Sequence, residues 1–275
     1  MSNPRENPRL ILKLLEQRAR KRFGQNFLAR ADIVARMVRG ARITKGDKVV
    51  EVGPGLGILT EELLRVGAEL TAVELDRDLA EYIRGQFGDQ MRLVEGDAMR
   101  QDWRTLCEGG GWKMVANLPY NIGTQLLMGA LQLPDVFATV TVMLQHEVVA
   151  RIVAEPGGKS YGALSVRAQV RGRARYLLPV PPESFHPPPK VNSAVLHVEL
   201  FDKPDVPVEP AAFDRVVKSA FSQRRKFVSN SLGALYGKDE AREALASCGI
   251  DADQRAESLS VDDYRALSVE LEGTP

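Results

Sequence analysis

Short apolar runs recur along the first half of the chain, and amphipathic segments lie between them. Each run has the length of a buried strand, while the segments between them repeat apolar residues every three or four positions, as helices do. The predicted strands are residues 49–52, 70–73, 91–94, 114–116 and 140–144. The predicted helices between them include residues 59–66, 78–87 and 123–131. This alternation predicts an α/β fold with a parallel sheet and helices on both faces.

Two later apolar runs, residues 174–180 and 194–200, have no helix between them. A proline-rich segment joins them, which predicts an antiparallel pair at one sheet edge with the prolines confined to the connection. After a Pro/Asp/Val linker the patterns are only helical: residues 211–222, 226–235, 239–246 and 261–271, the last preceded by a Ser260–Asp263 capping arrangement. We therefore expect one domain over residues 1–202, with a basic extension at 1–30, and a small all-helical domain over 203–275.

Composition excludes several classes of protein. The chain has 275 residues, of which 44% are apolar and 27% charged, so it is globular rather than disordered. Its 2 cysteines, Cys107 and Cys248, lie too far apart for a disulfide framework or a cysteine-rich zinc module. The apolar runs are much shorter than the ~20 residues that span a bilayer, and the N-terminus lacks the features of a signal peptide. We expect a soluble, cytoplasmic protein that contacts no membrane.

The formal net charge of +1 conceals an uneven distribution. Residues 1–48 hold 13 Lys and Arg against 4 Asp and Glu, and residues 215–226 hold 5 against none. Residues 49–110 are acidic, with 6 against 13. Separate basic blocks can converge into a surface for a polyanion such as RNA. The ordinary alternative, which charge alone favours, is that each block is a solvated face of the protein.

A glycine-rich loop, Gly53-Pro-Gly-Leu-Gly57, follows the first predicted strand and leads into a helix. Glycines allow a sharp turn and a close approach of the backbone to a ligand. The spacing G-x-G-x-G departs from the dinucleotide fingerprint G-x-G-x-x-G. Glu74 at the end of the second strand can accept hydrogen bonds from ribose hydroxyls, and Asp97 after the third can accept one from an adenine amino group. Together these features favour S-adenosylmethionine over NAD.

The tetrad Asn117-Leu-Pro-Tyr120 follows the fourth strand, at the carboxyl edge where open α/β sheets bind ligands. An exocyclic amine on a nucleobase is a poor nucleophile, because its lone pair is delocalised into the ring. Two acceptors, the Asn117 side-chain oxygen and the Leu118 carbonyl, could hold its N–H groups as charge develops. Pro119 stiffens the turn, and the Tyr120 ring offers a stacking surface for an extruded base. An ordinary strand-to-loop turn with a buried tyrosine is the alternative for these four residues.

At these residues the chain resembles the ribosomal RNA adenine N6,N6-dimethyltransferases, and most of all the bacterial small-subunit (16S) enzymes of the KsgA family. The resemblance covers nearly the whole chain. It includes KRFGQNFL (21–28), EVGPGLG (51–57), VELD (73–76), GDA (96–98), NLPYNI (117–122), MLQ (143–145), YGALS (161–165), FHPPPKVNS (185–193), SQRRK (222–226), RAESL (255–259) and Tyr264. His146 departs from the family pattern, which has a lysine there, and Val115-Ala116 stand where a glycine is more common.

The resemblance implies a class I, Rossmann-like methyltransferase fold with a seven-stranded, mostly parallel sheet. It also implies the reaction: methyl transfer from S-adenosylmethionine to N6 of two adjacent adenosines in the hairpin loop near the 3′ end of 16S rRNA. The partner would be the small ribosomal subunit or its late precursor, approached by a monomer. No metal is implied.

The resemblance further implies roles for individual residues. Gln25, Asn26 and Leu28 would cover the methionine end of the cofactor. Gly53 and Gly55 would form its loop, with Glu74 on the ribose and Asp97 with Ala98 on the adenine. Asn117 would contact both the cofactor and the target amine, and Phe185 would stack on the base opposite Tyr120. The residues expected to contact RNA phosphates are Arg20, Lys21, Arg22, Arg224, Arg225 and Lys226.

Three other functions stay open from the sequence. The large-subunit (23S) adenine methyltransferases of the macrolide-resistance type share most of these motifs, although the Phe23-Gly24 pair and the Arg255-Ala-Glu block favour the small-subunit branch. A ribosome-assembly checkpoint factor could retain the fold while its catalysis is secondary or lost. An NAD-dependent dehydrogenase would require a dinucleotide pocket.

Overall fold

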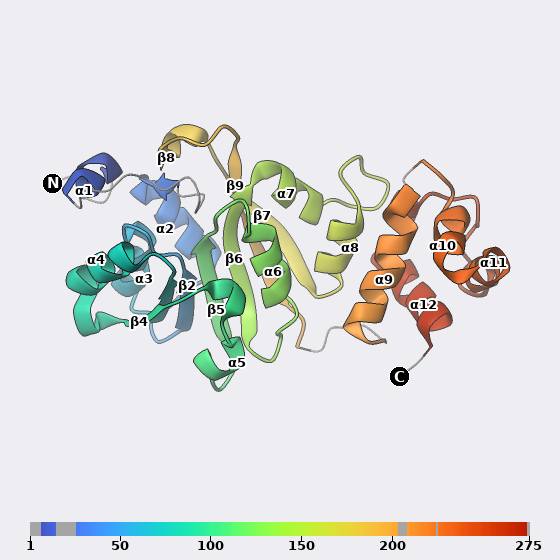
Figure 1. The fold of residues 1–275 in the computed structure, drawn as a ribbon, viewed down its shortest axis with the longest axis horizontal. Helices are drawn as coiled ribbons and strands as arrows, with labels where there is room; N and C mark the ends of the chain where they lie inside the picture. Colours follow the sequence, from blue (N-terminus) through green and yellow to red (C-terminus); the bar gives the residue numbers. More distant parts are fainter. Residues whose placement is uncertain (1–6, 15–25, 203–207, 224, 274–275) are drawn as a thin grey trace. The chain divides into compact units, whose positions relative to one another are not determined.

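The computed structural model describes residues 7–14, 26–202, 208–223 and 225–273. These residues form two compact units (Figure 1). The first unit contains the described residues up to Val149 together with Arg175–Asp202. The second contains Ala150–Ala174 together with the described residues from Val208 onward.

A seven-stranded sheet forms the centre of the first unit. Its strands lie in the order β4 (Arg92–Glu95), β3 (Glu69–Glu74), β2 (Lys48–Val52), β5 (Trp112–Asn117), β6 (Phe137–Gln145), β9 (Ser193–Leu200) and β7 (Gly172–Val180). The pairs from β4 through β6 are parallel, and β9 is antiparallel to β6. The predicted strands and the mostly parallel sheet are therefore confirmed. The central strands are buried on both faces, which explains their nearly uninterrupted apolar runs.

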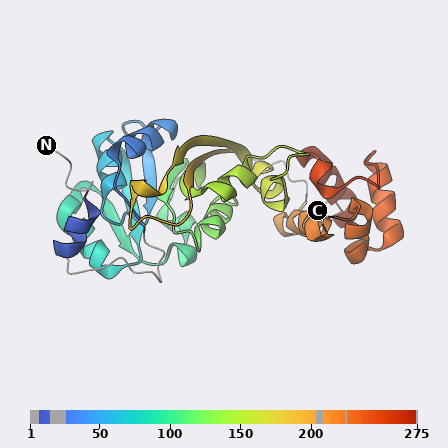
Figure 2. The ribbon, with the colours of Figure 1, turned by 90° about the horizontal axis from the view of Figure 1, so that it is seen from above.

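Helices cover both faces of this sheet (Figures 1 and 2). They are α2 (Ala31–Gly40), α3 (Ile58–Arg65), α4 (Arg77–Phe87), α5 (Trp103–Leu106), α6 (Gly123–Ala130) and α7 (His146–Ile152). From β2 the chain steps through β3 to β4 toward one edge, whereas from β5 it steps to β6 toward the other. Because such crossovers are right-handed, the two directions place α3 and α4 on one face and α6 on the opposite face. The direction of winding changes between β2 and β5, where such sheets bind ligands.

The glycine loop after β2 is covered by a short N-terminal layer. Helix α1 (Pro8–Leu14) buries Ile11 and Leu12 against Phe27, Leu56 and Leu79. Strand β1 (Phe27–Leu28) pairs antiparallel with β8 (Phe185–His186), which follows the short 3-10 helix η5 (Pro182–Ser184). Residues distant in sequence thus come together above the glycine loop, a contact that periodicity does not predict.

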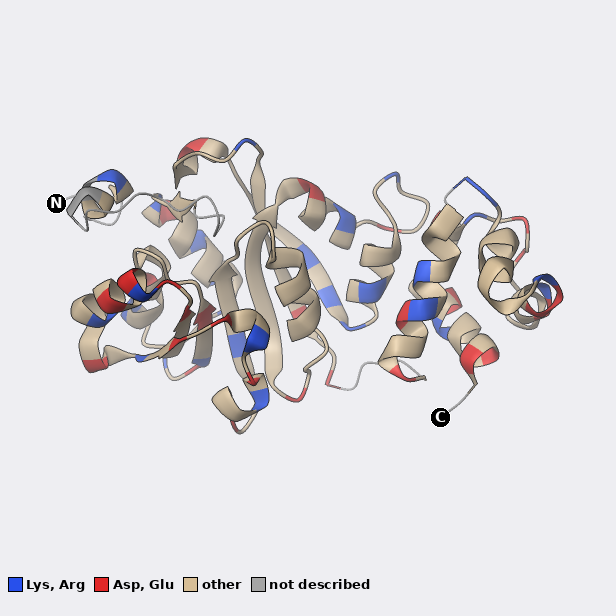
Figure 3. Cartoon of the chain, in the orientation of Figure 1, with Lys and Arg blue, Asp and Glu red and all other residues tan. Residues whose placement is uncertain are grey.

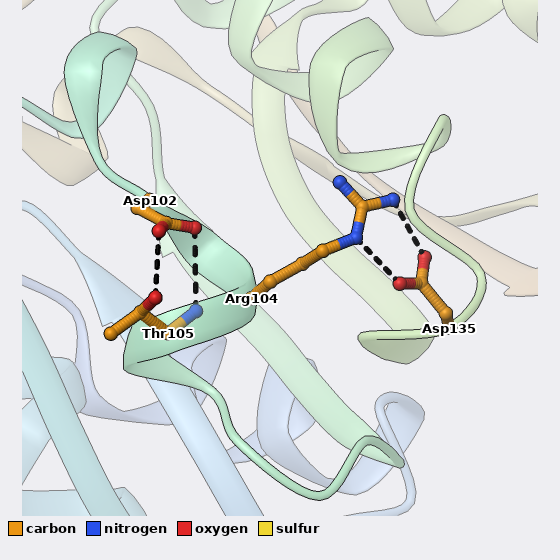
Figure 4. Close-up of polar contacts among 4 residues, drawn as sticks. All are labelled: Asp102, Arg104, Thr105 and Asp135. Carbon is orange, nitrogen blue, oxygen red and sulfur yellow. Dashed lines mark hydrogen bonds and ion pairs between the residues drawn. The ribbon is translucent and has the colours of Figure 1, made fainter.

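Polar contacts organise the opposite end of the strands, where β5 and β6 begin. Asp102 caps α5 by accepting hydrogen bonds from the Thr105 backbone N–H (3.3 Å) and hydroxyl (2.6 Å) (Figure 4). Arg104 forms a two-bond ion pair with Asp135, at 2.7 and 3.2 Å, just before β6. Both partners are more than half exposed, so solvent screens this pair and it adds little to stability. We interpret these contacts as structural.

The edge strand β7 corrects one expectation. The predicted run 174–180 forms β7, but it includes Pro179, so the prolines are not all confined to the connection. Strand β7 is the last strand of the sheet, and Pro179 is exposed. A proline lacks the N–H that a central strand must donate, so an edge strand is the position in a sheet that tolerates it.

The second unit is helical. It contains α8 (Ala163–Gln169), α9 (Pro210–Ala220), α10 (Val228–Tyr236), α11 (Lys238–Ser247) and α12 (Val261–Glu272), with the 3-10 helices η6 (Phe221–Gln223) and η7 (Ala256–Ser258). The four C-terminal helices were predicted, and so was the start of α12, where Ser260 and Asp263 cap each other's backbone N–H.

One segment departs from the predicted division at residue 202. Tyr161, Val166 and Val170 are fully buried in the same core as Phe213 and Val217 of α9. Ala150–Ala174 therefore belong to the second unit, although their last three residues begin strand β7 of the sheet. No element was predicted for residues 145–173, so neither helix α8 nor the unit that buries its apolar face was expected.

Candidate active site

A cavity of about 300 Å³ opens at the carboxyl ends of the central strands. It is lined by residues that follow β2, β3, β4 and β5, together with Asn26 and Phe27 from the N-terminal layer. Its volume lies at the lower end of the range for small-molecule sites. The predicted site residues that line it are Asn26, Gly53, Gly55, Glu74, Asp97, Ala98, Asn117, Leu118, Pro119 and Tyr120.

The glycine loop has a backbone that only glycine adopts easily. Gly53, Gly55 and Gly57 have φ angles of 68°, 59° and 83°, in the left-handed region. A Cβ on Gly57 would lie 2.7 Å from the Phe87 ring, and one on Gly55 would lie 3.2 Å from the Phe27 ring. The three glycines are therefore required by local conformation and packing, and the loop keeps its backbone close to the cavity.

Glu74 ties this loop to the end of β3. Its carboxylate accepts hydrogen bonds from the backbone N–H groups of Gly55 (3.2 Å) and Asp76 (2.9 Å). Glu74 is only 6% exposed, and burial raises the pKa of its carboxyl group above the ordinary value. The two backbone donors oppose that effect. A fixed, buried carboxylate at the cavity wall suits recognition of ribose hydroxyls.

Asp97 and Ala98 lie where the chain leaves β4. One oxygen of Asp97 accepts a hydrogen bond from the Met99 backbone N–H at 2.9 Å, which starts the 3-10 helix η4 (Ala98–Arg100). Leu75 and Met99, which the sequence analysis did not single out, also line the cavity. Leu75 is 51% exposed, which is unusual for a large apolar side chain. Apolar side chains beside a carboxylate acceptor suit a flat heteroaromatic ring such as adenine.

Asn117 ends β5 and faces the cavity together with the rest of the tetrad. Its side-chain nitrogen donates a hydrogen bond to the Asn26 carbonyl at 3.2 Å, which orients the amide. The Leu118 backbone N–H donates to the Met143 carbonyl, while the Leu118 carbonyl accepts no hydrogen bond from any described residue. The Pro119 carbonyl accepts from Ile122 and Gly123 and so begins α6. Two oxygens, one on Asn117 and one on Leu118, are thus available to accept hydrogen bonds at the cavity wall.

The Tyr120 ring is held from its hydroxyl end. Tyr120 Oη and Ser193 Oγ form a hydrogen bond of 2.5 Å, and burial raises the pKa of the phenol above its ordinary value. Tyr120 is therefore a neutral residue whose ring is fixed in the cavity wall. Ser193 was quoted as part of a motif but was not expected to support the tyrosine.

Several predicted site residues lie elsewhere. Phe185 is 4% exposed and packs in the main core of the first unit, and it does not line the cavity. Leu28 pairs with Phe185 across the β1–β8 ladder and lines a smaller hollow of about 40 Å³ behind the glycine loop. Gln25 lies outside the described residues. The stacking role of Phe185 and the cofactor contacts of Gln25 and Leu28 stay predictions.

The predicted RNA contacts are only partly described. Arg20, Lys21, Arg22 and Arg224 lie outside the described residues. Arg225 and Lys226 lie exposed in the turn between η6 and α10 (Figure 3), and neither has an acidic partner among the described residues. Among all residues that the structure describes, no three His, Cys, Asp or Glu side chains are grouped so that they could bind a metal ion. No helix in the described ranges has the length and apolarity to cross a bilayer.

A family model described as ribosomal RNA adenine dimethylase matches residues 16–272. The chain belongs to this family. The chain is 45% identical over 260 residues to the ribosomal RNA small subunit methyltransferase A of Geobacter metallireducens, covering 91% of this chain and 94% of the relative. The protein of the same name from Pseudomonas aeruginosa is 40% identical over 267 residues, covering 96% of this chain and 98% of the relative.

Solved structures show the same fold. A dimethyladenosine transferase from Plasmodium falciparum superposes with a TM-score of 0.77 at 22% identity, covering 89% of this chain and 97% of that chain. The 23S rRNA methyltransferase ErmE superposes with a TM-score of 0.70 at 23% identity, covering 90% of this chain and 100% of the ErmE chain. The class I, Rossmann-like methyltransferase fold is confirmed, and the chain is a methyltransferase.

Proposed function

We propose that this enzyme transfers methyl groups from S-adenosylmethionine to N6 of two adjacent adenosines in the 3′-terminal hairpin loop of 16S rRNA. Each adenosine would receive two methyl groups, giving N6,N6-dimethyladenosine during small-subunit biogenesis. The enzyme would act in the cytoplasm, as a monomer, on the small subunit or its late precursor. The oriented Asn117–Tyr120 tetrad beside the glycine loop carries this proposal.

The residues of the cavity fit S-adenosylmethionine. Gly53 and Gly55, both with positive φ, bring their backbone to the cavity wall, and Glu74 presents a buried carboxylate beside them. Asp97, Leu75 and Met99 would enclose the adenine. The cofactor brings a methyl group already activated by its sulfonium, so no strong base is needed in the protein.

The protein itself would orient the target amine. The Asn117 oxygen and the Leu118 carbonyl would each accept one N–H of the adenine amine, which favours a pyramidal nitrogen with its lone pair directed at the methyl group. As the N–C bond forms and the S–C bond of the sulfonium breaks, with S-adenosylhomocysteine as the leaving group, the nitrogen would become cationic, and the same two oxygens would stabilise that charge until a proton leaves to water. Since the Asn117 amide is already held by the Asn26 carbonyl, little reorganisation is required.

Tyr120 would hold the base in place. A base drawn out of an RNA loop loses its stacking neighbours, and an aromatic ring in the pocket replaces one of them. The hydrogen bond to Ser193 fixes the ring before the base arrives. After one methylation a single N–H remains, so one acceptor suffices for the second transfer.

The test is methyl transfer to isolated ribosomal subunits. The enzyme is incubated with labelled S-adenosylmethionine and undermethylated small subunits, and in parallel with large subunits, and the RNA is digested to nucleosides. We expect label in N6,N6-dimethyladenosine from the small subunit alone. Label from the large subunit would instead place the enzyme with the resistance-type methyltransferases. Binding to small subunits without any label would indicate an assembly factor that lost its chemistry.

A further inference from the structure

A second hollow, of about 390 Å³, lies in the first unit outside the cofactor cavity. We call it the flanking groove. It is lined by residues 145–147, by Pro182 and by residues 190–192. The lining comes from the end of β6, the start of α7 and the proline-rich connection before β9.

Ser193, which lines neither hollow, links the flanking groove to the target side of the active site. Gln145 pairs with Ser193 in the β6–β9 register, and Ser193 holds the Tyr120 hydroxyl at 2.5 Å. Asn192 directly precedes Ser193, about 3.3 Å along the strand. The His146 backbone N–H donates to the Asn192 carbonyl at 2.9 Å, which joins the two sides of the groove. The groove therefore begins one residue away from the side chain that anchors Tyr120.

Aromatic and polar side chains at the groove are not used by the fold. The His146 ring meets the Tyr176 ring edge to face, with centroids 5.9 Å apart, and both residues are exposed. The side chains of Gln145, Lys190 and Asn192 form no hydrogen bond or ion pair with any other described residue. Of the two rings only His146 lines the groove, and burial and packing do not explain why two amides, a cation and this imidazole are grouped there.

These groups match the chemistry of one unpaired nucleotide. Aromatic faces stack on any base, amides bond to base edges, and a lysine attracts the phosphate of the backbone. The negative charge of Glu147 offsets the positive charge of Lys190 in the groove lining. The groove therefore has no net positive charge to attract polyanions in general. Recognition would depend on stacking and hydrogen bonding.

We propose that the flanking groove binds the nucleotide next to the adenosine being methylated, with its base on the His146 ring and its phosphate near Lys190. This inference rests on the proposed function, because it requires a single-stranded RNA target in the cavity beside it. When one of two adjacent adenosines occupies the cavity, the other occupies the groove. The groove would thus orient the RNA and determine which adenosine is methylated first.

The first experiment compares variants on undermethylated small subunits. We expect His146→Ala and Lys190→Ala each to raise the KM for the subunit about tenfold, the loss expected for one base-stacking or phosphate contact, with kcat unchanged. His146→Phe, which keeps an aromatic ring, should restore the KM. Lys45→Ala, an exposed lysine before β2, is the matched charge control and should behave as wild type. Isothermal titration should show the same affinity for S-adenosylmethionine in all variants.

The second experiment replaces the adenosine that would occupy the flanking groove. Small subunits are prepared in which one adenosine of the pair is replaced by uridine, whose smaller ring stacks less strongly. The wild type should lose affinity for these subunits, whereas His146→Ala should lose little more, because the two changes remove the same contact. Additive losses, or an unchanged KM for both His146→Ala and Lys190→Ala, would overturn the groove proposal. A wild-type enzyme that labels no small subunit would instead overturn the proposed function.

Discussion

The side-chain amide of Asn117 has different roles at its two ends. Its nitrogen is held by the Asn26 carbonyl, 3.2 Å away, and its oxygen is left to accept a hydrogen bond from the substrate. A fixed acceptor lowers the barrier more than a mobile one, since its dipole is already oriented when charge develops. This division of roles depends on Asn26, which is 91 residues earlier in the chain.

We predict that Asn117→Ala lowers kcat for methyl transfer about 100-fold, the cost typical of removing one preorganised hydrogen-bonding group. Affinity for the small subunit should change little, because the substitution does not alter the charged surface. Single-turnover transfer of labelled methyl groups and a subunit-binding assay measure the two quantities. Gln132→Ala, an exposed residue after α6, serves as the control. An unchanged rate in Asn117→Ala would disprove the role of Asn117 as acceptor.

Glu51 is a buried acid beneath the glycine loop. It is 1% exposed and accepts a hydrogen bond from the Thr60 hydroxyl at 2.7 Å. Burial, with a smaller contribution from the charge of Glu74, raises the pKa of its carboxyl group to about 8 from 4.5. Between these two values the folded protein holds a proton that the unfolded chain releases. The free energy of unfolding therefore falls as the pH rises through this range.

We predict that Glu51→Gln flattens this pH dependence. The wild type should lose up to about 1.4 kcal/mol of unfolding free energy per pH unit from this group between roughly pH 5 and 8. Urea unfolding at several pH values measures the slope. Glu69→Gln, on the exposed start of β3, should keep the wild-type slope. Equal slopes for wild type and Glu51→Gln would show that Glu51 is ionised throughout.

A buried ion cluster joins α8 to α9 within the second unit. Asp214 of α9 accepts bonds from Arg167 of α8 at 2.5 Å and from Arg171 just after it at 3.3 Å. Burial alone would raise the pKa of the Asp214 carboxyl group, but the two arginines outweigh that effect and hold it below its ordinary value. Arg171 is 2% exposed, so its charge depends on Asp214 for compensation.

We predict that Asp214→Ala destabilises the second unit by about 3–5 kcal/mol, because it leaves a buried guanidinium without a counter-charge. Thermal and urea unfolding, followed by circular dichroism, measure the loss. Asp239→Ala, at the exposed start of α11, is the comparison. A loss below about 1 kcal/mol would mean that the cluster behaves as a surface ion pair.

Charge along the entire chain suggests how the enzyme meets a ribosomal particle. Its net charge is only +1, so a uniform field does not draw it to RNA. Binding would instead depend on local basic segments, of which Arg225 and Lys226 are described, exposed and without acidic partners among the described residues. Each lysine or arginine on a phosphate releases bound counterions, which makes the affinity depend on salt.

We predict that the double substitution Arg225→Ala and Lys226→Ala weakens binding to small subunits and lowers the slope of log K against log salt by about 2, one unit for each phosphate contact. Cofactor affinity should stay at the wild-type value. Filter binding at several salt concentrations measures the slope, with Lys218→Ala on α9 as the control. A slope equal to that of the wild type would mean that these residues are solvated and contact no phosphate.

Local patterns in the sequence were sufficient for much of this protein. The strands from β2 to β6, the glycine loop, the four C-terminal helices and the Ser260 cap could all be predicted, because each depends on residues close together in the chain. The site residues after β2, β3, β4 and β5 could be placed at one sheet edge for the same reason, since parallel strands bring their carboxyl ends together.

Contacts between distant residues required the tertiary structure. Periodicity did not show that Ala150–Ala174 belong to the second unit, that Phe185 is buried away from the cavity, or that Leu75 is exposed at its rim. Nor did it bring Ser193 to Tyr120 or form the flanking groove. An apolar pattern shows that a side chain will be buried, whereas its partner is chosen by the packing of the entire fold.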